Sequence, residues 1–101
     1  MEEIQFHFEW DEAKAATNLQ KHGISFDLAR TIFDDPNLLT VADLAHSENE
    51  ERWFSIGTSS GGAVVSVAYL WTKSSASIVR IRLISARRAT QAEMSQYGGS
   101  L

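Results

Sequence analysis

The sequence predicts an α+β fold, in which one strand and two helices lead into an antiparallel sheet. Residues 4–10 alternate apolar and polar side chains, which is typical of a strand with one buried face. Residues 11–35 hold two segments with apolar residues at helical spacing, each bounded by capping residues. Residues 52–85 hold three segments rich in Val, Ile and aromatic residues, separated by short turns.

The first strand and the first helix follow each other directly. The strand is expected to turn its apolar side chains inward, namely Ile4, Phe6, Phe8 and Trp10. Asp11 offers an N-cap for a helix over residues 11–22, and Gly23 supplies a left-handed C-terminal stop. The apolar residues of this helix at helical spacing are Ala13, Ala16 and Leu19.

A second helix is predicted from Ser25, which can cap it, to residue 35. Its apolar stripe consists of Phe26, Ala29, Ile32 and Phe33. Pro36 ends the helix, because proline disfavours helical backbone at the preceding residue.

The rest of the chain is predicted to form the sheet and a last helix. A short extended piece at residues 37–41 precedes a polar loop at 43–51. Strands over residues 52–58, 63–72 and 77–85 make an antiparallel sheet of three to four strands, followed by a short C-terminal helix over 89–97. In the last strand, Arg80 and Arg82 share the face opposite Val79, Ile81 and Leu83. That face is the candidate functional surface.

Composition indicates one domain over residues 1–101, since 44% hydrophobic residues suffice for one core. Cysteine is absent, which excludes disulfides, thiol catalysis and thiolate metal sites. The acidic N-terminus does not fit a secretion signal and no apolar run is long enough to cross a membrane, so we expect a cytoplasmic protein.

The charges are distributed unevenly along the chain. The net charge of −4 argues against a protein that coats nucleic acid generally. However, all 13 acidic residues except Glu93 precede Arg52, whereas most bases lie at Arg52 or after it. The cationic second half predicts a local binding surface for a polyanion.

Two long blocks resemble the BrnT-like toxins. The first consists of residues 8–14 followed by 18–26, which include Phe8-Glu9-Trp10-Asp11 and Lys21-His22-Gly23, and the second is residues 81–90. Shorter matches occur in the same order between them, at 33–36, 46–48, 51–52 and 56–57. The resemblance implies a RelE-like fold, a ribonuclease that blocks translation, no metal cofactor, and a BrnA-like antitoxin that binds DNA. The expected partners are therefore this antitoxin and RNA, with DNA reached only through the antitoxin and no membrane contact. Members of this family usually have a short hairpin with a basic residue in this region. Here the segment 70–77 is longer and mostly neutral.

RNA cleavage without a metal needs a base, an acid and a cation for the charge on phosphorus. Arginine suits the last role because its planar fork holds two phosphate oxygens. We expect Arg82, Arg87 and Arg52 in the catalytic site, with His46 as general acid or base. The alternatives are that the arginines pair with the acidic loop or the antitoxin, and that His46 is an ordinary surface residue.

The predicted RNA-binding residues beyond this site are Arg80, Arg88, Lys73 and Tyr97. Lys73 would replace the basic residue that family members carry in the hairpin, and Tyr97 could stack on a base. The three histidines have no ligand spacing, so we expect neither a metal nor another cofactor. His22 fits a capping role at the end of the first helix, and His7 should face solvent.

Three functions are compatible with these observations. The retained Arg82 and Arg87 favour a ribonuclease toxin. The acidic balance favours a catalytically inactive binding module that keeps the fold and the antitoxin interface. A stand-alone domain with an unknown protein partner is the third possibility, and a neighbouring antitoxin gene would exclude it.

Overall fold

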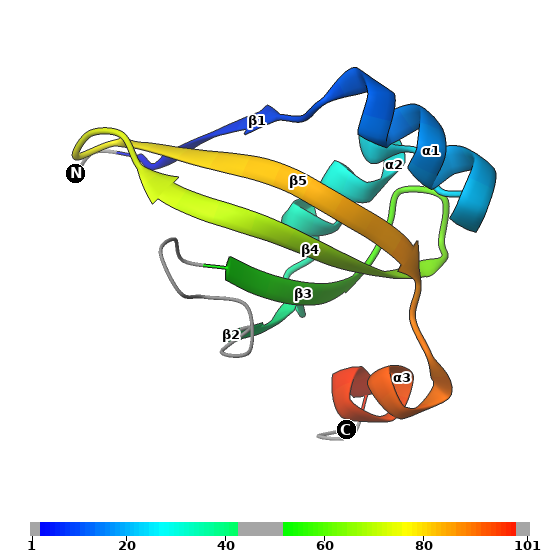
Figure 1. The fold of residues 1–101 in the computed structure, drawn as a ribbon. Helices are drawn as coiled ribbons and strands as arrows, with labels where there is room; N and C mark the ends of the chain where they lie inside the picture. The colour runs from blue at the N-terminus through cyan, green and yellow to red at the C-terminus, as the bar shows by residue number, and fades with distance from the viewer. Residues whose placement is uncertain (1–2, 43–51, 99–101) are drawn as a thin grey trace.

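The computed structural model describes residues 3–42 and 52–98, which form a five-stranded sheet with helices around it (Figure 1). The strand order is β1-β5-β4-β3-β2, with β1 parallel to β5 and the other neighbours antiparallel. The elements are β1 (Gln5–Glu9), α1 (Glu12–His22), α2 (Phe26–Ala29), the 3₁₀ helix η1 (Arg30–Asp34), β2 (Leu39–Ala42), β3 (Arg52–Thr58), β4 (Val64–Lys73), β5 (Ile78–Arg88) and α3 (Gln91–Gly98).

The predicted α+β class and the order of elements are confirmed. The sheet has five strands rather than three or four, and it is mixed because β1 lies parallel to β5. Periodicity reports which side chains share a face but not which strand pairs with which, so it did not reveal the parallel pair. The predicted loop at residues 43–51 lies outside the described residues.

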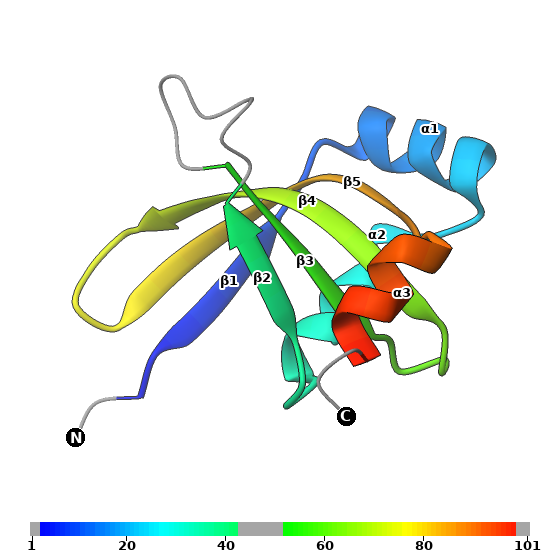
Figure 2. The ribbon, with the colours of Figure 1, turned by 90° about the horizontal axis from the view of Figure 1, so that it is seen from below.

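The core lies between one face of the sheet and the pair α2 and η1 (Figure 2). The apolar stripe predicted for the second helix is confirmed. Phe26, Ala29 and Ile32 are buried, and Phe33 packs against the core. Across from them lie Val65, Val67 and Tyr69 of β4 and Val79, Ile81, Leu83 and Ala86 of β5. The second half of the predicted helix tightens to 3₁₀ geometry just before Asp35-Pro36, a common way to end a helix.

Gly57 of β3 lets η1 approach the sheet closely. A Cβ atom at this position would lie 2.9 Å from Cβ of Ile32 and 2.9 Å from Cδ1 of Leu38. Real Cβ contacts are essentially never that short, so any other residue would push η1 or the β2 connection away.

Two predicted apolar stripes are wrong in part. In β1, Phe8 packs against the core, but Ile4 is 59% and Phe6 47% exposed. In α1, Leu19 is 50% exposed, Ala13 and Ala16 are exposed too, and the buried residue is Asn18. The α1 residues are exposed because α1 lies along the edge of β5 beyond the end of β1 (Figure 1), and Ile4 lies before β1 begins.

Asn18 joins α1 to this edge of β5. The register of β1 on β5 ends at Glu9 and Arg82. Farther along, the Asn18 side chain accepts a hydrogen bond from the Ala86 N–H at 3.0 Å and donates to the Ala86 carbonyl at 2.8 Å. It also donates to the Ile24 carbonyl at 2.9 Å. The Asn18 amide thus forms the hydrogen bonds with Ala86 that the backbone of a neighbouring strand would otherwise form.

The ends of α1 follow the prediction. Asp11 accepts hydrogen bonds from the N–H groups of Ala13 at 2.8 Å and Lys14 at 3.1 Å, and these bonds lower the pKa of its carboxyl. Gly23 ends the helix with φ of 71°, the left-handed conformation that glycine adopts without strain.

The last strand continues to Arg88, beyond its predicted end at residue 85. The β4–β5 register shifts between Ala68 and Tyr69, because β5 carries a bulge there. Leu83 and Ala86 both face the core, and two residues, Ile84 and Ser85, lie between them. The bulge therefore returns Arg87 to the same side of the sheet as Arg82.

Candidate functional site

The side of the sheet opposite α2 and η1 carries four of the eight predicted site residues, and we call it the open face. Residues directly opposite each other on neighbouring strands share a face. The register places Glu9, Arg82, Leu70 and Arg52 in one row across β1, β5, β4 and β3. Arg82 is exposed and Arg52 half-buried, and their backbones lie about 10 Å apart, two strand spacings.

Arg80 and Arg82 share one carboxylate on the open face. Nε of Arg80 lies 3.6 Å from Oε1 of Glu9, and Nη1 of Arg82 lies 3.8 Å from Oε2. All three side chains are roughly half exposed, and exposed ion pairs of this kind contribute little to stability. The Arg82 guanidinium is therefore accessible to an anion that displaces Glu9.

Arg87 is held much more tightly, by Glu93 of α3. Its Nη1 and Nη2 atoms donate to the two Glu93 carboxylate oxygens at 2.7 and 3.0 Å. The Glu93 side chain is only 13% exposed, and its carboxylate also accepts from the Thr90 N–H at 2.8 Å. The Arg87 hydrogen bonds lower the pKa of Glu93 and Glu93 raises the pKa of Arg87. Arg87 thus fastens α3 to the sheet.

Tyr97 fastens the other end of α3. Its hydroxyl donates to the Asp35 carboxylate and lies 2.9 Å from the Thr58 hydroxyl. Asp35 also accepts from the backbone N–H groups of Thr58 at 2.7 Å and Asn37 at 2.8 Å. Burial raises the pKa of Asp35, but the hydrogen bonds outweigh it and the pKa is lowered. The Tyr97 hydroxyl therefore has a structural partner already.

The structure separates the remaining predicted residues. In the β4–β5 register, Arg88 lies opposite Val65 and Lys73 lies opposite Val79. Both valines are buried on the core side, so Arg88 and Lys73 do not lie on the open face. His46 lies outside the described residues. His7 is exposed opposite Arg80, as expected, and His22 is the last residue of α1.

Glu9 and Glu93 were not predicted as partners of the arginines. Thr90 and Glu93 have the spacing of a capping box, and the Glu93 N–H does donate to the Thr90 hydroxyl at 3.2 Å. That spacing was a usable sequence signal for Glu93. Glu9 had none, because its position depends on the parallel pairing of β1 with β5.

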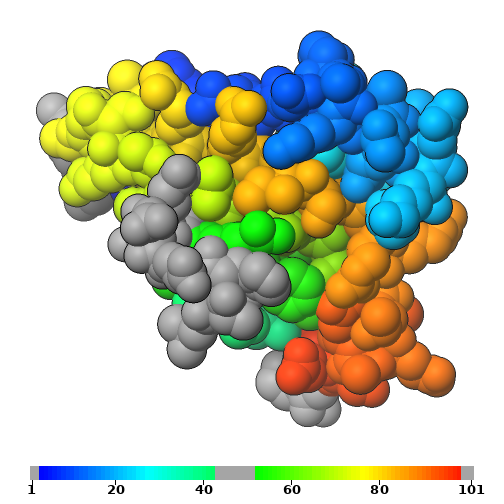
Figure 3. All heavy atoms as spheres, in the orientation of Figure 1, coloured from blue at the N-terminus to red at the C-terminus, as the bar shows by residue number. Residues whose placement is uncertain are grey.

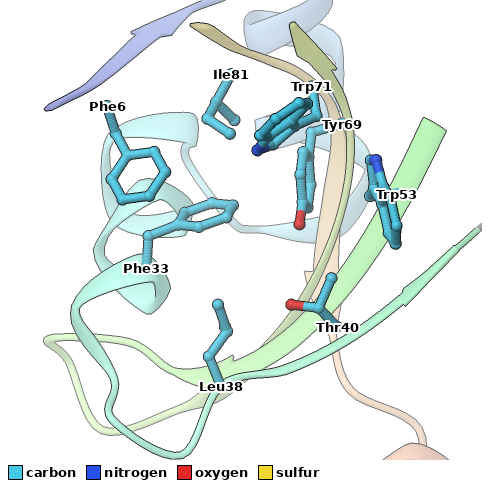
Figure 4. A pocket seen from close by; sticks show the side chains of 8 residues that line it. All are labelled: Phe6, Phe33, Leu38, Thr40, Trp53, Tyr69, Trp71 and Ile81. Atoms are coloured by element: carbon cyan, nitrogen blue, oxygen red, sulfur yellow. The ribbon is translucent and has the colours of Figure 1, made fainter. Parts of the chain in front are cut away.

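An apolar pocket of about 290 Å³ lies on the core side, between the sheet and Phe33 of η1 (Figure 4). Its lining side chains are Phe6, Phe33, Leu38, Thr40, Trp53, Tyr69, Trp71 and Ile81. None of these is charged, so the pocket lacks the groups that phosphate chemistry requires. Within residues 3–42 and 52–98, no three His, Asp or Glu side chains form a group that could hold a metal ion. Nor is any helix there long and apolar enough to span a membrane.

Comparison with known proteins identifies the family. The model of the family described as "Ribonuclease toxin, BrnT, of type II toxin-antitoxin system" matches residues 10–93. The crystal structure of the Brucella abortus ribonuclease toxin BrnT superimposes with a TM-score of 0.58 and 25% identity, covering 90% of this chain and 99% of that one. No protein with a curated description matches the chain. The chain belongs to the BrnT family of ribonuclease toxins of type II toxin–antitoxin systems.

Proposed function

We propose that this protein is a cytoplasmic endoribonuclease that cleaves RNA on the open face without a metal ion, and thereby inhibits translation. The observation that supports this most is the exposed Arg82, whose only described ion pair is a loose one, with Glu9 at 3.8 Å. A phosphate group can replace such a carboxylate, because it offers the arginine fork the same pair of oxygens with more charge.

In the reaction we propose, the 2′-oxygen of the RNA bonds to phosphorus and the bond from phosphorus to the 5′-oxygen breaks. A base takes the 2′-hydroxyl proton, and an acid returns a proton to the leaving oxygen. Arg82 stabilises the charge that develops on the phosphoryl oxygens, and Arg52, across Leu70 in the same row, adds to it. His46 is our candidate for the proton transfers.

We assign the other predicted residues by their position. Arg80 neighbours Arg82 on the open face and supports binding of the RNA strand. Arg87 adds positive charge there, but its fork is engaged with Glu93, so it acts mainly by holding α3 in place. Arg88, Lys73 and Tyr97 can contact RNA only where the strand leaves the open face.

A type II toxin has an antitoxin partner, and we propose a BrnA-like protein in this role. It would cover the open face and carry the only contact of the complex with DNA.

The test is RNA cleavage by purified protein in the presence of EDTA. Arg82→Ala should lower the rate about 100- to 1,000-fold, as loss of other charge-stabilising donors does. Arg82→Lys should restore the rate only in part, because a point charge cannot make a two-pronged contact. Arg30→Ala, which removes an exposed arginine from η1, is the control. Cleavage by Arg82→Ala at the wild-type rate, with equal melting temperatures, would show that the assignment is wrong.

The second candidate is a binding module without catalysis. It is favoured by the carboxylates that partner Arg80, Arg82 and Arg87 on the open face. Wild-type protein that binds the antitoxin but cuts no RNA would support this candidate.

A further inference from the structure

A groove lies between α1 and β5, and its α1 wall carries basic side chains. It has a volume of about 330 Å³ and is lined by Lys14, Thr17 and Lys21 of α1 and by Ile84 and Ser85 of β5, among others. Figure 3 shows the side of the molecule on which β5 (orange) lies between α1 (blue) and α3 (red). None of these groove residues belongs to the site described above.

We propose that this groove binds phosphates of the RNA strand on one side of the scissile bond. The substrate is then a single strand that extends beyond the two nucleotides joined by that bond. This rests on the proposed function. The first argument is continuity with the open face. Ile84 and Ser85 are the bulge residues between Arg82 and Arg87, and they face away from the buried Leu83 and Ala86. The groove therefore opens onto β5 between the two arginines.

The second argument is the charge of the groove. Lys14 and Lys21 are two helical turns apart on one side of α1, about 10 Å along its axis. Both are exposed, and within the described residues neither forms an ion pair with a carboxylate. Lysine ammonium groups are compact, mobile charges that bind phosphates without reading sequence.

The third argument concerns the kind of ligand. The lining offers ammonium and hydroxyl groups, the His22 imidazole and the Asn18 amide, and Ile84 is its only large apolar side chain. A peptide partner of high affinity needs a desolvated apolar or aromatic anchor, which this groove does not provide. A polyanionic strand needs only the charges, and it reaches Arg82 by following the wall of the groove.

The experiment compares the double variant Lys14→Ala/Lys21→Ala with wild type on two RNAs, a tetranucleotide and a strand of about 14 nucleotides. Each phosphate contact on single strands contributes a slope of about 0.7 in log K against log salt. Losing two contacts should reduce the magnitude of this slope for the long RNA by about 1.4. The affinity of the double variant for the long RNA should be about tenfold lower than that of wild type at about 0.15 M salt. Cleavage of the tetranucleotide should not change. Arg30→Glu changes the net charge by the same amount on another surface and is the matched control.

Three results would overturn the inference. If wild type and the double variant bind the long RNA equally, with equal salt slopes, the groove does not bind the substrate. If the double variant loses only affinity for the antitoxin, the groove belongs to the protein interface. If wild type neither binds nor cuts either RNA, the proposed function fails and this inference fails with it.

Discussion

Asn18 shows how one polar residue can organise the architecture. It is buried on α1, and its amide pairs with both backbone groups of Ala86 and with the Ile24 carbonyl. Helical spacing pointed instead to Ala13, Ala16 and Leu19, because apolar residues are normally the ones that face a core. Nothing in the spacing distinguishes a buried asparagine from an exposed one, so this residue could not be predicted from the pattern.

We expect Asn18→Ala to destabilise the fold strongly. It would leave the Ala86 N–H and two carbonyls without partners, each costing about 1–3 kcal/mol when buried. Leu19→Ala removes a larger side chain from the next position, but that side chain is half exposed, and we expect a change within about 0.5 kcal/mol. Urea unfolding of both variants checks this. Equal stability of the two would mean that the Asn18 contacts contribute nothing.

Among the elements, α3 is attached unusually, because it has no fully buried residue. It is held at one end by Glu93 on Arg87 and at the other by Tyr97 on Asp35. Polar attachment makes α3 sensitive to the protonation of the two carboxylates. Its helical limits were predictable from Thr90 and the terminal glycines, whereas its anchoring was not, since it depends on a strand that runs on to Arg88.

Acid should weaken this attachment. The folded-state pKa of Glu93 lies below its ordinary value of 4.5, so its contribution to stability is complete above about pH 4.5 and is lost as the pH falls through the folded-state pKa. Glu93→Gln lacks this contribution at every pH. The stability difference between wild type and Glu93→Gln should therefore be largest near pH 6 and shrink toward pH 3.

Thermal melting of both proteins across this pH range measures the difference. Asp35 and Asp11, whose pKa values are also lowered, give both proteins the same acid-sensitive background. A difference that stays constant from pH 6 to pH 3 would show that the Glu93 carboxylate does not stabilise the folded protein.

For the whole molecule, the sequence predicted the α+β class and the side that carries the arginines. Alternation in β5 was sufficient for this, because it separates Arg80 and Arg82 from Val79, Ile81 and Leu83. It could not reveal that Arg88 and Lys73 lie on the other side, since that depends on the bulge and on the register with β4. It also could not reveal the parallel edge strand.

The open face predicts how the protein behaves with its antitoxin. We expect co-expression with its antitoxin to give a complex that elutes earlier than the toxin alone in gel filtration and cuts no RNA, because we propose that the antitoxin covers the arginines of the open face. Expression alone should arrest growth, and expression of Arg82→Ala should not. A protein that still elutes as a monomer in the presence of the antitoxin, and has no effect on growth, would indicate a stand-alone domain.

The parallel pairing of β1 with β5 has a consequence for how the chain is made. Gln5 lies opposite Ile78, and Glu9 lies opposite Arg82. Strands β3, β4 and β5 follow one another as local hairpins, whereas β1 must wait for a partner that is synthesised near the end, and such distant contacts form slowly. During translation the row from Glu9 to Arg52 cannot assemble until almost the whole protein has left the ribosome. A partly synthesised chain therefore lacks the finished face on which we propose that RNA is cleaved.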